Sequence, residues 1–215
     1  MLDENLIANI LSLTLFFVSL FIALRAFYLY FQARSRRVFI LALSMGMIAL
    51  TAIAGFAGDN ITSINLNVDW FNYIGQTVSF LFILLSFARN ADDYQRGLIR
   101  WHIIISALLL ILLLLAPVLP DFPDPAVTKT VLSGSRSLIC AVIFFHYIIA
   151  FTTKETRFSL LMAGAFLLLS AGYLVILPKY YSTANTTLNL TLIDHTGDIT
   201  RVCGLILLLV AVLLG

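Results

Sequence analysis

The sequence predicts an all-α membrane protein, a bundle of seven transmembrane helices with the N-terminus outside and the C-terminus inside. Of the 215 residues, 61% are hydrophobic and only 11% are charged, whereas soluble domains carry about 25% charged residues. The mean hydropathy of +1.02 indicates that lipid surrounds most of the chain. Seven long apolar runs and an uneven distribution of basic residues give the rest of the prediction.

Each apolar run is long enough for one crossing of the bilayer, which takes about 20 residues. Backbone groups in lipid must form hydrogen bonds within their own segment, so each run is expected to be a helix. The predicted helices cover about 6–31, 38–57, 68–87, 101–119, 130–151, 158–177 and 197–215. Together they form one predicted transmembrane domain over residues 1–215.

Basic residues gather in alternate loops and set the orientation. The loops after the first, third and fifth helices hold Arg34, Arg36, Arg37, Arg89, Arg96, Arg100, Lys154 and Arg157. The opposite side holds Lys129 and Lys179 but also Asp3, Glu4, Asp59, Asp69, Asp121, Asp124, Asp194 and Asp198. Because cytoplasmic loops carry the excess of Lys and Arg, the N-terminus is expected outside. The basic inner loops 32–37 and 89–100 are expected to contact anionic lipid headgroups, with a partner-docking site as the alternative.

The two ends of the chain predict whether the first helix is retained and whether the chain continues after the last one. The first residues are acidic, where a signal peptide would be basic, so the first helix is expected to be retained. The last helix runs to Gly215 without a basic residue behind it. Two alternatives remain: a chain that ends there, and a longer chain that continues into a cytoplasmic domain.

The predicted outer loops are of two kinds. Residues 117–125 contain four prolines, which predicts a stiff turn. Residues 64–67 and 188–192 alternate apolar and polar side chains, the period of a strand. We therefore expect a small two-stranded outer cap built from the second and sixth loops.

Two parts of the sequence suggest an internal repeat of three helices, one connecting helix and three helices. Residues 28–37 align with 147–157, and 69–75 with 198–204; each of the latter pair has an acid six residues before a glycine. Chance similarity of leucine-rich segments is the alternative.

The 3+1+3 plan resembles that of the sugar-transporting SWEET proteins. The first and fifth helices of those proteins are kinked by proline, whereas no predicted helix core of this chain contains a proline.

Polar side chains follow one face of the third helix and recur in the fifth and seventh. Groups of this kind are costly in lipid, so they are expected to face protein or a water-filled cavity. The candidate ligand-binding residues are Asp69, Asn72, Gln76, Arg136, Asp198 and Arg201. Two interpretations remain open: ion pairs that fasten the two halves, or an outward-opening pocket for a small polar or anionic ligand with the arginines as anchors.

Histidine and cysteine do not form a recognisable cofactor or metal motif. His102 is predicted at the inner start of the fourth helix and His146 near the inner end of the fifth. A haem held between two helices uses such a pair, but the two predicted depths differ, so no cofactor is expected. His195 is expected in the outer cap, in contact with water. Cys140 and Cys203 lie in apolar runs without metal-ligand spacing, and no metal site is predicted.

The pattern favours a non-enzymatic integral membrane module that binds or senses a small polar or anionic ligand from the outer side. Its layout is similar to that of seven-helix input domains of bacterial or archaeal signalling proteins. The alternatives are a small-solute transporter or channel of 3+1+3 layout, and an accessory transmembrane subunit of a larger complex. No nucleophile–base pair is evident, so no enzyme is expected.

The expected partners are the lipid bilayer of the plasma or cell membrane, the ligand, and a second copy or a larger membrane complex. No nucleic-acid module is visible.

Overall fold

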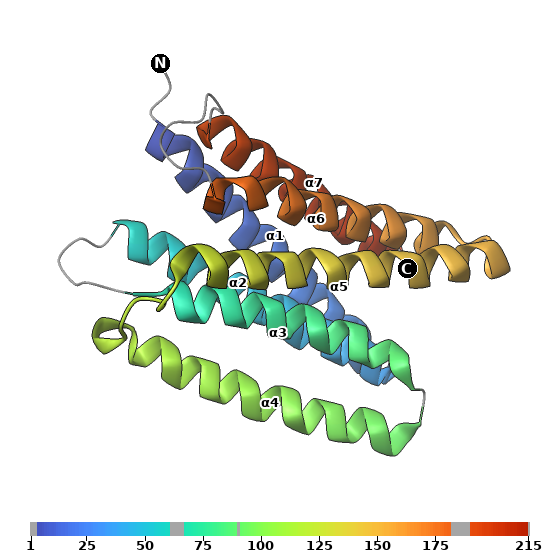
Figure 1. Cartoon of the computed structure of the whole chain (residues 1–215). Helices are drawn as coiled ribbons and strands as arrows, with labels where there is room; N and C mark the ends of the chain where they lie inside the picture. Colours follow the sequence, from blue (N-terminus) through green and yellow to red (C-terminus); the bar gives the residue numbers. More distant parts are fainter. Residues whose placement is uncertain (1–3, 61–66, 90, 182–189, 215) are drawn as a thin grey trace. The chain divides into compact units, whose positions relative to one another are not determined.

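The computed structural model describes residues 4–60, 67–89, 91–181 and 190–214, and in these residues all regular structure is helical. The elements are α1 (Glu4–Ala33), α2 (Arg36–Asn60), α3 (Asp69–Ala88), α4 (Asp92–Leu114), the short 3-10 helix η1 (Ala116–Val118), α5 (Pro125–Lys154), α6 (Arg157–Tyr181) and α7 (Leu190–Leu214) (Figure 1). Within the described residues, seven helices are long and apolar enough to cross a membrane. The prediction of seven spanning helices is confirmed at this level.

The largest difference from the predicted boundaries is at α4. This helix begins at Asp92 rather than near position 101, and it ends at Leu114 rather than at 119. Asp92 and Asp93 lie in its first turn, where a negative charge interacts favourably with the helix dipole. The arginines at 96 and 100 also belong to the helix. Charged residues end the apolar run, but they do not end the helix.

The predicted outer cap is not supported where the structure describes it. α7 begins at Leu190, so the strand predicted over 188–192 is wrong for its last three residues. Alternation of apolar and polar side chains over so few residues fits the first turn of a helix as well as a strand. Asn67 lies outside any regular element, and residues 64–66, 188 and 189 lie outside the described part of the chain.

A second correction concerns proline. The sixth helix was expected to end at 177, but α6 continues to Tyr181 and has Pro178 in its interior. Proline removes one backbone hydrogen bond and normally kinks or ends a helix. Helices of membrane proteins tolerate it better, because neighbouring groups satisfy the freed carbonyl.

The chain divides into two compact units. Unit 1 comprises Met1–Thr14 and Phe122–Gly215, and unit 2 comprises Leu15–Asp121. The single domain over 1–215, the membrane orientation and the 3+1+3 repeat stay predictions.

In unit 1, α6 packs against both α5 and α7, and glycines let the backbones of α6 and α7 approach closely. A Cβ atom on Gly172 would lie 2.9 Å from the carbonyl oxygen of Gly197 and 3.1 Å from the backbone nitrogen of Arg201. A Cβ atom on Gly204 would lie 3.0 Å from the carbonyl oxygen of Ala165. Small residues at helix contacts are typical of membrane proteins, where association depends on close packing.

Two serines join α5 to α6. The hydroxyl of Ser137 donates to the carbonyl oxygen of Ser170, and the hydroxyl of Ser170 donates to the carbonyl oxygen of Ser137, both at 2.9 Å. The two hydroxyl oxygens are 3.2 Å apart. Reciprocal bonds of this kind fix the register of the two helices.

In unit 2, α3 packs against α2 and α4 (Figure 1). Two apolar clusters each contain residues from all three helices. The clusters contain Met47, Ala54, Phe71 and Leu109 in one, and Ile40, Phe82 and Leu98 in the other. The ring of Tyr30 in α1 lies 4.7 Å from that of Phe39 in α2, measured between centroids. Aromatic contact therefore joins α1 to the rest of this unit.

The proline-rich turn after α4 is tied to the start of α3. The indole nitrogen of Trp70 donates to the carbonyl oxygen of Pro120 at 2.7 Å, and the amide of Asn67 donates to the Asp121 carboxylate at 3.0 Å. The backbone nitrogen of Asn67 also donates to the carbonyl oxygen of Ala116 at 3.1 Å. These bonds satisfy polar groups at an irregular part of the chain.

Candidate functional site

Side chains from three helices of unit 1 meet at one tyrosine ring. The guanidinium carbon of Arg136 (α5) lies 4.6 Å from the ring centroid of Tyr173 (α6), and that of Arg201 (α7) lies 5.1 Å from the same centroid. Tyr173 is only 4% exposed. The face of an aromatic ring carries partial negative charge and attracts a cation, more strongly where water is excluded. We call Arg136, Tyr173 and Arg201 the arginine–tyrosine cluster.

Hydrogen bonds also hold Arg136, which is 4% exposed. Its Nη2 donates to the Ser133 hydroxyl at 2.7 Å, and its Nε donates to the carbonyl oxygen of Leu132 at 3.3 Å. The Ser133 hydroxyl lies 3.4 Å from the hydroxyl of Tyr180 on α6. A charge this deeply buried is tolerated only when such groups replace its water.

Arg201 forms an ion pair with Asp198, one turn earlier on α7. The two side chains are 16% and 23% exposed, so the pair is mostly shielded from water. The Nε of this arginine is buried and has no hydrogen-bond acceptor among the described residues. An unsatisfied buried donor is costly, so an oxygen that reached this nitrogen would be bound favourably.

The other three candidate residues lie on α3 in unit 2. Gln76 donates through Nε2 to the hydroxyl of Thr51 on α2 at 3.2 Å. The amide nitrogen of Asn72 packs over Gly55, where a Cβ atom would lie 3.0 Å from it. The Oδ1 atom of Asn72 is buried without a donor among the described residues. Asp69 is the first residue of α3 and is partly buried.

The six candidate residues thus form two sets of three. The structure brings Arg136, Asp198 and Arg201 together in unit 1, and it brings Asn72 and Gln76 onto the α2–α3 contact in unit 2. That the two sets line one pocket stays a prediction. The Asp198–Arg201 pair lies within α7, so it does not itself connect two helices, and both interpretations of the candidate residues stay predictions.

Tyr173 was missed in the sequence, although it is the centre of the cluster. A tyrosine inside an apolar run has the pattern of a core or lipid-facing residue. Nothing in the spacing separates it from the other tyrosines of α6, at 180 and 181. Its role depends on which side chains of neighbouring helices reach it.

His102 does not lie at the start of its helix, because α4 begins at Asp92. It is 1% exposed and lies between two hydroxyls, with Nε2 3.0 Å from Ser44 and Nδ1 3.0 Å from Ser106. Its ring centroid is 4.3 Å from that of Phe82. Both ring nitrogens are therefore engaged within unit 2, an arrangement that does not favour a haem ligand.

The remaining metal-binding side chains do not gather. His146 is exposed on α5, and His195 is half-buried inside α7 rather than in a cap loop. Among the described residues, no group of three or more His, Cys, Asp or Glu side chains could hold a metal ion. Comparison of the chain with protein-family models, with curated proteins and with solved structures gave no match.

Proposed function

We propose that the chain is a non-enzymatic integral membrane module that binds a small anionic ligand at the arginine–tyrosine cluster from the outer side. The seven apolar helices support a membrane location. Support for the ligand comes from Arg136 and Arg201, whose guanidinium groups both lie against the ring of Tyr173. Guanidinium groups are well suited to carboxylate and phosphate oxygens, which they bind through paired N–H donors.

One observation carries the proposal: the buried Nε of Arg201 has no acceptor among the described residues. The Nη2 atom of this arginine already contacts Asp198, so an incoming anion would bind to the N–H of Nε, beside that contact. The ion pair then has a positioning role, because it holds the guanidinium in place. If no ligand binds, the contacts of the arginine–tyrosine cluster serve only to connect the helices.

The test is a thermal unfolding experiment on the purified protein in nanodiscs. Succinate and inorganic phosphate are each titrated against chloride at constant ionic strength. Binding to the folded state adds about 2.7 kcal/mol of stability when the ligand reaches 100 times its Kd, so a saturable rise of the unfolding temperature is expected with at least one anion. Arg201→Lys keeps the charge but removes Nε, and it should abolish the rise.

The matched control is Arg157→Lys, because Arg157 is exposed at the start of α6 and belongs to the same unit. It should leave the rise unchanged. If neither anion gives a saturable effect, or if Arg201→Lys behaves like the control, the cluster is a structural connection between helices and the proposal fails.

A further inference from the structure

A polar pocket lies in unit 2 where the turn between α1 and α2 meets the first turn of α4. Its volume is about 390 Å³, and it is lined by Arg34, Ser35, Arg36, Arg37, Asp92 and Gln95. We call it the basic pocket. Three of the six lining residues are arginines and one is an acid, so the lining carries an excess of positive charge.

The first arginine owes its position to the backbone. α1 ends at Ala33 and α2 begins at Arg36, so only two residues reverse the chain. Arg34 has a φ of 53°, in the left-handed region that a non-glycine residue rarely adopts. Its backbone nitrogen donates to the carbonyl oxygen of Tyr30 at 2.8 Å, which ends α1, and its side chain is exposed.

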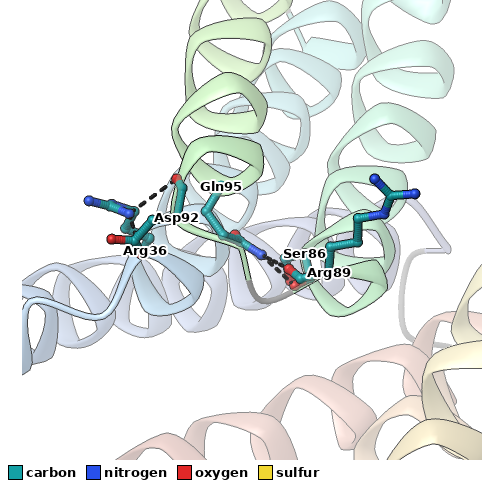
Figure 2. A network of polar contacts seen from close by, with 5 residues as sticks. All are labelled: Arg36, Ser86, Arg89, Asp92 and Gln95. Atoms are coloured by element: carbon teal, nitrogen blue, oxygen red, sulfur yellow. Dashed lines mark hydrogen bonds and ion pairs between the residues drawn. The ribbon is translucent and has the colours of Figure 1, made fainter.

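The other two arginines are held by the helices that face the turn. Figure 2 shows Arg36 reaching Asp92: its Nη1 pairs with the carboxylate and donates to the backbone carbonyl oxygen of the same residue at 3.1 Å. Arg37 donates through Nε to the carbonyl oxygen of Ser86 at 3.1 Å, and its guanidinium lies 5.8 Å from the ring centroid of Phe87. These contacts orient both guanidinium groups in advance of any ligand.

Gln95 adds a second kind of chemistry to the basic pocket. It is 4% exposed, and its Nε2 donates to the carbonyl oxygens of Ser86 at 2.9 Å and Arg89 at 2.7 Å (Figure 2). Because both partners are acceptors, the orientation of the amide is fixed. Its Oε1 is then a buried acceptor that has no donor among the described residues. The arginines can bind an anion, but only a ligand that also carries a donor, such as a hydroxyl group, would satisfy this oxygen.

The place of the basic pocket along the helices indicates its level in a bilayer. It lies where four candidate membrane spans begin or end, at Ala33, Arg36, Ala88 and Asp92. The ends of spanning helices lie at the height of the lipid headgroups. By the distribution of basic residues this is the predicted inner face, where basic pockets between helices bind anionic headgroups.

We infer that the basic pocket binds a phosphate anion that also carries a hydroxyl group, the chemistry of a phosphatidylglycerol headgroup or of soluble glycerol phosphate. Arg34, Arg36 and Arg37 donate to the phosphate oxygens, and the hydroxyl donates to Oε1 of Gln95. The level of the pocket in the bilayer favours the lipid. The inference is independent of the arginine–tyrosine cluster, because it uses other residues, in the other unit of the chain.

The experiment is native mass spectrometry of the intact protein in a neutral detergent, with phosphatidylglycerol, phosphatidic acid, phosphatidylcholine and soluble glycerol phosphate as probes. We expect phosphatidylglycerol to bind more tightly than phosphatidic acid, which lacks the headgroup hydroxyl, and both to bind more tightly than phosphatidylcholine. Equal binding of phosphatidylglycerol and phosphatidic acid would overturn the role of Gln95. Glycerol phosphate that binds as tightly as the lipid would assign the site to a soluble anion.

Two variants test the position of the site. Arg34→Gln should weaken phosphatidylglycerol binding on the order of fivefold to tenfold. Arg100→Gln removes the same charge from an exposed position of α4 that does not line the pocket, and it should have little effect. An equal loss in both variants would mean general attraction between charges and would overturn the site. Gln95→Met should remove the preference for phosphatidylglycerol; if it does not fold, the comparison of lipids on the unaltered protein still decides.

Discussion

Gly172→Ala offers a quantitative test of the contact between α6 and α7. The new methyl group would lie 2.6 Å from Cγ of Arg201, 2.9 Å from the carbonyl oxygen of Gly197 and 3.1 Å from the backbone nitrogen of Arg201. The arginine side chain can turn away, but the two backbone atoms cannot. The helices must therefore separate, and the guanidinium of Arg201 must move relative to Tyr173.

The expected magnitude follows from two opposing effects. Overpacking a close contact costs about 1–3 kcal/mol, whereas replacing glycine by alanine within a helix gains up to about 1 kcal/mol. The net loss is then about 0–3 kcal/mol. We expect Gly172→Ala to lower the free energy of unfolding by about 1–2 kcal/mol rather than to have no effect, because backbone atoms form the obstacle.

The control is Gly134→Ala on α5, in the same unit. A Cβ atom there would meet nothing within 4 Å, so only the helix gain remains, about 0.5–1 kcal/mol. Unfolding is followed by circular dichroism at 222 nm as sodium dodecyl sulfate is added to protein in a mild detergent, with conditions as commonly used for helical membrane proteins. If Gly172→Ala is as stable as Gly134→Ala, the close approach of α6 and α7 is wrong.

Three further outcomes are expected. Ser44→Ala should lower the free energy of unfolding by about 1–3 kcal/mol, because it leaves Nε2 of the buried His102 without its partner; no change in the same unfolding titration would count against this contact. In a double-mutant cycle, Ser137→Ala and Ser170→Ala should show a coupling energy of about 0.6–1.7 kcal/mol, and additive losses would contradict the reciprocal bonds. A cysteine at Thr153, which is exposed near the end of α5, should react with a membrane-impermeant maleimide only from the cytoplasmic side; labelling from outside would reverse the predicted orientation.

The sequence was sufficient for the helices because long apolar runs leave few alternatives in lipid. It was less informative about their ends. Charges such as Asp92 mark where the hydrocarbon ends, but hydrogen bonding within the helix continues through them. The start of α7 at Leu190 was missed for a similar reason. Apolar and polar side chains alternate there over only a few residues, which fits a strand and the first turn of a helix equally well.

The candidate residues show a similar division. Arg136 and Arg201 stood out because a charge in an apolar run must find a partner. Tyr173 did not, and neither did Gln95, which lies within the predicted inner loop 89–100. What distinguishes these two is burial against particular neighbours, and burial results from tertiary packing rather than from local pattern.

The glycines along α6 and α7 have a consequence for tracing the ancestry of this chain. Gly164 also belongs to this contact, since a Cβ atom there would lie 2.9 Å from a side-chain carbon of Leu207. Leucine-rich segments diverge easily, because one branched apolar residue replaces another at little cost. A side chain at Gly172, Gly197 or Gly204 would meet atoms of the facing helix, so we expect the spacing of these glycines to change more slowly than the surrounding sequence. Distant homologues would then be recognised by where they lack side chains rather than by the side chains they share.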